Sequence, residues 1–257
     1  MRGLTKLTLI GAGFLVHTLT CVPVESTLPD PVPHNAAIPG FTRADVVPEL
    51  LQIWLDFEGG DLRYKAGCGG LAWDQTCNKG TEGAYSAFSG DATVQAVIAS
   101  ELERIFAPYN TRITKHRPAI GAVVHVVFTD RGAYIERKYD FVALGFATVD
   151  CANYNPTGTV FVQDIGELGA LSYAATAAHE VGHTLGFEHS STTPNVMNRS
   201  STDGSLFLDA CVLVDDEKEP KCSDADRAWL GCAPGQRNYH QELMVLTWPP
   251  ELATSVE

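Results

Sequence analysis

The sequence is short of positive charge. Lysine and arginine together number 18, against 31 aspartate and glutamate residues, so the 257-residue chain has a formal net charge of −13. Binding to nucleic acid or to an anionic membrane surface needs clustered Lys and Arg that neutralise phosphates. The acidic balance therefore argues against nucleic acid as a partner, and it says nothing positive about a substrate.

Long hydrophobic runs are also missing. The run from Leu7 to Leu19 is nearly free of charge, but it is shorter than the roughly 20 apolar residues that cross a bilayer, and no later segment is long enough. Arg2 and Lys6 precede it, an order typical of an export signal. We therefore expect a signal peptide over residues 1–21 and no transmembrane span. The alternative is a buried N-terminal helix.

Cysteine usage agrees with export. Cys21 stands where the apolar run ends, and without it six cysteines remain, an even number that suits disulfides in an oxidising compartment. Sequence does not choose among their pairings, although proximity favours Cys68 with Cys77. Leu19-Thr20-Cys21 also loosely resembles a bacterial lipoprotein cleavage box, with Thr20 in place of Gly or Ala. We expect a secreted, extracellular protein, and a lipid anchor at Cys21 on a bacterial cell surface stays open.

The chain is organised as one folded domain behind a linker. Residues 22–48 contain six prolines and predict an extended linker or short pro-segment, so the domain covers 49–257. Residues 59–90 are rich in glycine and predict a long loop stapled by a disulfide. Apolar patterning predicts strands over 50–57, 112–115, 122–128, 144–149 and 159–163, and helices over 91–106, 170–185 and 223–230. This order predicts one α/β domain with a loop-rich C-terminal part and an apolar tail at 243–248.

The segment HEVGHTLGFEH, which begins at His179, carries the chemistry. Residues four apart lie on one face of a helix, so His179 and His183 can present two imidazoles to one metal. Gly186 can adopt the left-handed conformation that ends a helix, after which the chain can bring His189 to the same point. Three neutral imidazoles and a water make a tetrahedral, open zinc site. Glu180 lies beside the first ligand, where its carboxylate can reach a metal-bound water without being a ligand.

This segment resembles the zinc-binding signature of the metzincin clan of metallopeptidases. Eight residues past His189 the sequence has Met197, and metzincins have a methionine turn beneath the zinc. The spacing, and Ser190 directly after the third histidine, are most similar to the matrixin branch. The resemblance implies a zinc-dependent endopeptidase with one catalytic zinc on the three histidines. It also implies Glu180 as the general base and Met197 as a turn residue that is not a ligand.

The resemblance also implies a fold and a kind of substrate. The expected fold class is α/β (α+β) of the zincin type, with a twisted mixed five-stranded sheet, two main helices and a loop-rich C-terminal subdomain. The expected partner is a protein or peptide substrate that pairs with an edge strand, for which 144–149 is the candidate. We expect a monomer.

Several positions depart from the matrixin pattern. Residues 129–144 contain no histidine, so a second, structural zinc is not expected, and no cysteine-switch motif occurs in 22–48. Asp130 and Asp140 are expected to be solvated rather than calcium ligands, which leaves calcium uncertain. Arg199 stands two positions past the turn methionine, where some metzincins have a tyrosine. The remaining histidines have no partner at ligand spacing and are expected on the surface or in the core: His17, His34, His116, His125 and His240.

Two other function classes stay open. One is a secreted zinc-binding module without turnover, and the other is a metal-dependent hydrolase of a non-peptide amide or ester. A structural zinc site is usually closed by four protein ligands and needs no base, so Glu180 favours an enzyme. The turn methionine favours a peptidase among enzymes.

Overall fold

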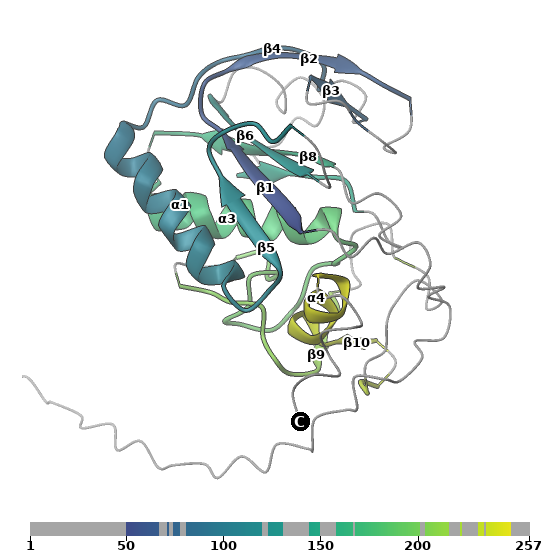
Figure 1. Cartoon of the computed structure of the whole chain (residues 1–257). Helices are drawn as coiled ribbons and strands as arrows, with labels where there is room; N and C mark the ends of the chain where they lie inside the picture. The colour runs from purple at the N-terminus through teal and green to yellow at the C-terminus, as the bar shows by residue number, and fades with distance from the viewer. Residues whose placement is uncertain are drawn as a thin grey trace, which may run out of the picture. The chain divides into compact units, whose positions relative to one another are not determined.

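Strands rich in β-branched and large apolar residues form a mixed five-stranded sheet with the order β5-β1-β6-β8-β7 (Figure 1). Neighbouring strands are parallel except at the edge, where β7 runs antiparallel to β8. The strands are β1 (Leu51–Asp56), β5 (Thr111–Thr114), β6 (Val123–Asp130), β7 (Gly145–Phe146) and β8 (Gly158–Asp164). The mixed sheet and its antiparallel edge confirm the predicted fold class, and β7 is shorter than the predicted strand.

The computed structural model describes residues 50–66, 71, 74–77, 81–119, 123–130, 144–149, 158–166, 168–200, 204–215, 222, 231–233 and 235–247. All of them fall in the second of two structural units of the chain, His34–Glu257. The predicted signal peptide, linker and helix at 223–230 lie outside the described residues. Among the helices that are described, none combines the length and the apolar character needed to cross a membrane.

Side chains of the central strands alternate between two apolar clusters, because successive residues of a strand point to opposite faces. Val126 and Val160 belong to the large core on the helical side. Val127 and Phe161, their chain neighbours, pack with Leu62 in a second cluster on the other side. Burial on both faces explains why these strands are continuous apolar runs rather than alternating patterns.

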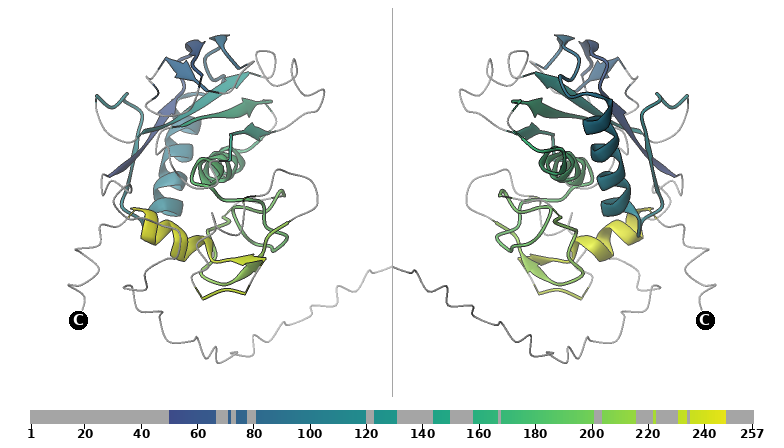
Figure 2. Two further views of the ribbon diagram at one scale, coloured as in Figure 1. Left: turned by 90° about the vertical axis from the view of Figure 1, so that its right-hand side faces the viewer. Right: turned by 90° about the vertical axis from the view of Figure 1, so that its left-hand side faces the viewer.

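Two helices cover the first of these faces, as Figure 2 shows. α1 (Ala92–Phe106) begins at Asp91, whose Oδ1 accepts hydrogen bonds from the backbone amides of Thr93 at 2.8 Å and Val94 at 3.0 Å. α3 (Ala170–Thr184) packs against α1 and β8, and its alanines allow close approach. Both helices confirm their predicted ranges to within a residue. Val97, although apolar, is exposed on α1.

The prediction of a loop over 59–90 is wrong for the described part of that range. A three-stranded sheet with the order β3-β2-β4 lies there, made of β2 (Gly60–Tyr64), β3 (Gln75–Thr76) and β4 (Gly83–Tyr85). Its strands are short and largely polar, and in β2 only Leu62 is buried. A single buried apolar residue cannot produce the alternating pattern by which a strand is predicted. Backbone hydrogen bonds between the strands and the contact of Leu62 with the main sheet stabilise this small sheet instead.

The C-terminal part contains a small hairpin and a helix. β9 (Val212–Leu213) pairs antiparallel with β10 (Gln236–Arg237), and α4 (Tyr239–Thr247) follows, taking in most of the predicted apolar tail. A disulfide joins Cys211 to Cys232 beside this hairpin, and Cys77 and Cys222 are also disulfide-bonded. Cys68 lies outside the described residues, so its pairing with Cys77 stays a prediction.

Candidate metal centre

α3 presents two histidines on one buried face. His179 and His183 are four residues apart, so they stand one helical turn from each other, and both side chains are buried. Their imidazole rings meet edge to face, with centroids 4.7 Å apart. The helix therefore holds the two rings in a fixed relation before the third histidine is added.

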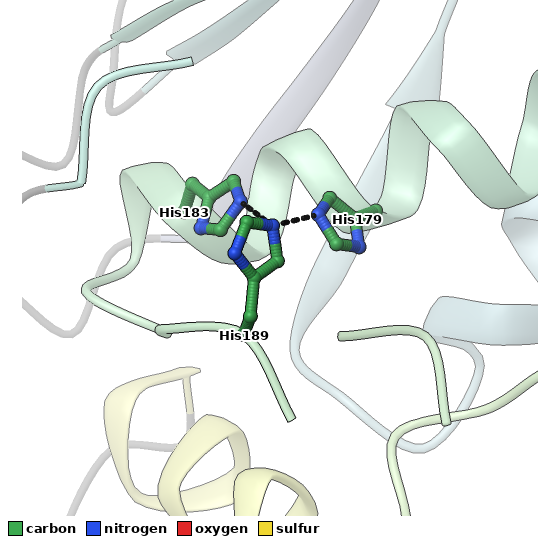
Figure 3. Close-up of side chains that lie close together, drawn as sticks. All are labelled: His179, His183 and His189. Carbon is green, nitrogen blue, oxygen red and sulfur yellow. Dashed lines mark hydrogen bonds between the residues drawn. The ribbon is translucent and has the colours of Figure 1, made fainter. Parts of the chain in front are cut away.

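A glycine turn brings the third histidine back to them. α3 ends at Thr184 with Leu185 as its C-cap, and Gly186 has a φ of 85°, a conformation that favours glycine. The amide of Gly186 donates to the carbonyl of His183 at 3.0 Å, and that of Phe187 donates to the carbonyl of Gly182 at 2.9 Å. This pair of bonds is the Schellman motif, which caps the last carbonyls and reverses the chain. The side chain of His189 then joins the first two (Figure 3).

Hydrogen bonds decide which ring nitrogen of each helical histidine is free of a proton. Nδ1 of His179 lies 2.7 Å from the carbonyl oxygen of Val196, and Nδ1 of His183 lies 2.6 Å from that of Phe187. A carbonyl oxygen only accepts, so both Nδ1 atoms donate, and in the neutral rings both Nε2 atoms carry a lone pair. Carbonyl partners of this kind orient metal-binding histidines in proteins.

The three Nε2 atoms converge as a metal ion requires. Nε2 of His189 lies 3.0 Å from Nε2 of His179 and 3.2 Å from Nε2 of His183. Two nitrogens bound at about 2.0–2.1 Å to a tetrahedral zinc are about 3.3 Å apart, close to both distances. Nε2 of His189 carries at most one proton, so it cannot donate a hydrogen bond to the Nε2 lone pairs of both His179 and His183. The donor set and its geometry therefore fit a zinc ion.

Burial keeps the first histidine neutral. The pKa of His179 is lowered to about 4, mainly by burial and also by the charges of His189 and Arg199, while the hydrogen bond to Val196 acts in the other direction. A neutral imidazole is the form that binds a metal, so at neutral pH His179 needs no deprotonation to act as a ligand.

Met197 packs against the helix that carries the first two histidines. Met197 is fully buried, and its Sδ lies so close to the helix that a Cβ added at Gly182 would be 2.4 Å away. The amide of Met197 donates to Oδ1 of Asn195, and its carbonyl accepts from the amide of Ser190 at 2.8 Å. This bond ties the turn to Ser190, the residue directly after the third histidine.

Glu180 extends from α3 beside this centre and is buried. Its carboxylate lies against the edge strand, because a Cβ added at Gly145 would be 2.5 Å from its Oε1 and 2.8 Å from its Cδ. Glu180, the base predicted from the sequence, therefore follows His179 in α3 and has its carboxylate against β7. Arg199 does not take the place of the tyrosine seen in some metzincins, since its guanidinium pairs with Asp215 at 2.9 Å.

The other described histidines belong to the core or the surface, as predicted. His125 is buried, stacks on Trp54 with ring centroids 4.0 Å apart, and bonds Oδ2 of Asp56 through Nε2 at 3.0 Å. His240 binds the hydroxyl of Tyr109 at 2.8 Å, and His116 is exposed. His17, His34 and Asp140 lie outside the described residues. Within the part of the chain that is described, the three-histidine group is the one cluster able to hold a metal ion.

Comparison with known proteins agrees with this geometry. The sequence model of metallo-peptidase family M12B, reprolysin-like, matches residues 86–190, about two fifths of the chain. The matched part runs from before α1 to the residue after His189. The match supports a metzincin-clan zinc metallopeptidase. The matched family is not the matrixin branch, and assignment of the chain to that branch stays a prediction.

Two further comparisons add little. The search of curated proteins found no match. Among solved structures, archaemetzincin from Archaeoglobus fulgidus, crystallised in complex with malonate, is 16% identical. The alignment covers 57% of this chain and 85% of that chain, with a TM-score of 0.30, too low to establish a shared fold.

The sequence did not reveal two groups at this three-histidine centre. One is Gly145, which touches the carboxylate of Glu180, and a glycine in a predicted strand gives no sign of such a contact. The other is the set of C-terminal residues that bind the loop before His189, led by Arg237 and Tyr239. They lie some 50 residues from the loop and form no motif with it, so only the fold shows the contact.

Proposed function

We propose that this protein is a zinc-dependent endopeptidase. The observation that carries the proposal is the convergence of three Nε2 atoms, with the buried Glu180 directly after the first ligand in α3. Bound zinc would act as a Lewis acid that lowers the pKa of water toward about 7 and polarises a carbonyl. His179, His183 and His189 would hold it and leave a fourth position open.

Glu180 is the general base of this proposal. It accepts a proton from the attacking water and delivers it to the amine that leaves. Gly145 leaves room for its carboxylate beside the sheet edge. The burial of Glu180 keeps bulk water from competing for the proton, and Met197 supports the helix face from below without acting as a ligand.

The edge strand is the proposed site of substrate binding. β7 lies at the end of the main sheet, and Leu144, just before it, is exposed. An extended peptide can add to such an edge through main-chain hydrogen bonds. Because β7 also borders Glu180, a peptide paired with it would pass the base. This placement favours a peptide substrate over a small amide or ester.

An oxidising compartment fits the same chain. The Cys211–Cys232 disulfide fastens the C-terminal hairpin, and disulfides persist outside the reducing cytosol. Together with the signal-like N-terminal sequence, this supports export to the extracellular space. Lipidation at Cys21 and binding of calcium carry no structural support from the described residues.

Replacement of Glu180 by Gln tests the proposed function. The variant keeps the size and polarity of the side chain but removes the base, so zinc should stay bound while cleavage of a peptide library falls by about 10²–10⁴-fold. Glu101→Gln is the matched control, because it makes the same change on a different helix, at a half-buried glutamate of α1 that pairs with Arg104. Near-normal cleavage by Glu180→Gln would overturn the mechanism. Zinc binding by the wild type without chelator-sensitive cleavage of any peptide would favour a binding module.

A further inference from the structure

The loop that carries the third histidine is anchored by the C-terminal part of the chain. The hydroxyl of Tyr239 lies 3.0 Å from the carbonyl oxygen of Glu188 and 3.3 Å from that of His189. The amide of Asp215 donates to the same His189 carbonyl at 2.8 Å. The backbone on both sides of His189 is therefore fixed by residues that come after it in the sequence.

Arg237 anchors the start of this loop. One guanidinium nitrogen, Nη1, donates to the carbonyl oxygen of Gly186 at 2.6 Å and lies 3.5 Å from Oε2 of Glu188. Nε and Nη2 bond both carboxylate oxygens of Glu242. Oε1 of Glu188 in turn accepts from the amide of Cys222 at 2.9 Å. The planar fork of the guanidinium thus spans α4 and the loop at once.

Burial makes this arrangement rigid. Only 3% of Arg237 is exposed. Burial lowers the pKa of Arg237, but the neighbouring carboxylates of Glu242 and Glu188 outweigh it, so the pKa rises and the cation is retained. A buried cation stays where its partners are, because separation from them leaves an uncompensated charge. The ring of Phe187 fills the space beside it, 5.3 Å from the guanidinium carbon.

The same C-terminal segment is itself held in place. Arg237 belongs to β10, which pairs with β9. The Cys211–Cys232 disulfide joins the residue before β9 to a residue shortly before β10. Tyr239 is fully buried at the start of α4 and packs on Phe187 with ring centroids 5.2 Å apart. Arg237, Tyr239 and both cysteines of the disulfide lie beyond residues 86–190, the segment that matches the metallopeptidase family. The anchor is therefore a property of this chain's own C-terminal part.

We propose that Tyr239 and Arg237 are positioning residues of the metal centre: they fix the backbone of the loop from Gly186 to His189 and thereby set the affinity for zinc. The inference rests on the proposed function, because it assumes that His189 is a ligand. The two helical histidines have α3 as a scaffold, but His189 lies on a loop. Its position relative to them depends on the groups that bind its carbonyls.

Tyr239→Phe tests the proposal in the full-length, disulfide-bonded protein. It keeps the ring that packs on Phe187 and removes only the hydroxyl. Affinity is measured by competition with a zinc chelator, and the visible spectrum of the Co²⁺-substituted protein reports the ligand geometry. We expect zinc to bind about 10–100-fold more weakly, as when other outer partners of metal ligands are removed, and the Co²⁺ spectrum to change.

Tyr109→Phe is the matched control. It also removes the hydroxyl of a buried tyrosine that contacts α4, because Tyr109 bonds His240, but it leaves the loop untouched. We expect its zinc affinity to stay within about 3-fold of wild type, well below the 10–100-fold effect of an outer partner. An equal loss in both variants would assign the effect to general loosening of α4 and overturn the proposal.

Arg237→Lys gives an independent reading if Tyr239→Phe folds poorly. Lysine keeps the charge but cannot bond Glu242 with two nitrogens and reach the Gly186 carbonyl together. We expect weaker zinc binding and an altered Co²⁺ spectrum here too. Wild-type affinity in both Tyr239→Phe and Arg237→Lys would overturn the positioning role alone. A wild-type protein that binds neither zinc nor Co²⁺ would instead overturn the proposed function, and the inference with it.

Discussion

Gly182→Ala is the substitution whose effect the structure determines most closely. Gly182 lies in α3 between the two helical histidines, and a Cβ there would be 2.4 Å from Sδ and 3.1 Å from Cε of Met197. Ordinary contacts of a Cβ are 3.4–4 Å. Met197 is fully buried in the turn beneath the site, so its sulfur must move by about 1 Å into a packed core.

Two opposing effects set the size of the change. Alanine in place of glycine inside a helix normally stabilises a protein by about 1 kcal/mol. Insertion of a methyl group into a packed core costs about 1–3 kcal/mol. The overpacking cost is the larger of the two here, so we expect a net loss of up to about 2 kcal/mol in the free energy of unfolding. Movement of Met197 should also shift Val196, whose carbonyl orients His179, and weaken zinc binding.

Urea unfolding of the metal-free, disulfide-bonded protein measures the first effect, and chelator competition measures the second. Gly169→Ala is the control, because Gly169 precedes the same helix with a φ of −71° and a Cβ there meets nothing within 4 Å. It should leave zinc affinity unchanged and lower the free energy of unfolding by at most about 1 kcal/mol, because Gly169 is the N-cap of α3, where glycine is preferred to alanine. If Gly182→Ala were more stable than wild type by about the 1 kcal/mol of helix propensity, the close contact with Met197 would not exist and the reasoning would fail.

Two other substitutions give clear expectations. Gly145→Ala places a methyl group against the carboxylate of Glu180, so we expect cleavage to fall by about 10²-fold with zinc affinity unchanged, and equal losses of both would contradict the proposed contact. Burial lowers the pKa of His125 below its ordinary value of 6.5, although the hydrogen bond to Asp56 acts in the opposite direction. Just below pH 6.5 this histidine therefore binds a proton in the unfolded chain but not in the folded protein. Stability should therefore fall as the pH drops below 6.5, and His125→Phe lacks this loss. The unfolding free energy of the wild type minus that of His125→Phe should therefore decrease from pH 7 to pH 5. A constant difference would refute the lowered pKa of His125 as the cause.

The features that the sequence predicts well are those with local causes. α1 was predicted because Asp91 caps it and Ile98, Leu102 and Ile105 recur at helical spacing, and these same side chains are buried. The metal cluster was predicted because four-residue spacing on a helix and a glycine turn are local geometry. In both cases the interacting groups lie within a dozen residues of one another.

The features that the sequence could not predict depend on distant partners. His125 finds Asp56 at a separation of 69 residues, and no spacing rule relates them. The small sheet was not predicted because its strands bury few apolar residues and so lack an alternating apolar pattern. Tertiary contacts determine where these strands form. Arg237 was missed because a lone arginine in a loop-rich segment normally faces solvent. Arg237 is buried because the fold places Glu242 and the loop from Gly186 to His189 around it.

The anchor at the C-terminal end has a consequence for the order in which the site is completed during synthesis. α3, the three histidines and Met197 have all been made by residue 197, yet the groups that hold the loop before His189 arrive only with residues 215–239. If the anchor sets zinc affinity as proposed, a nascent chain possesses every ligand long before it can bind the ion tightly. The proposed peptidase activity would then begin only after α4 has been made, and an incomplete chain could not cleave nearby proteins.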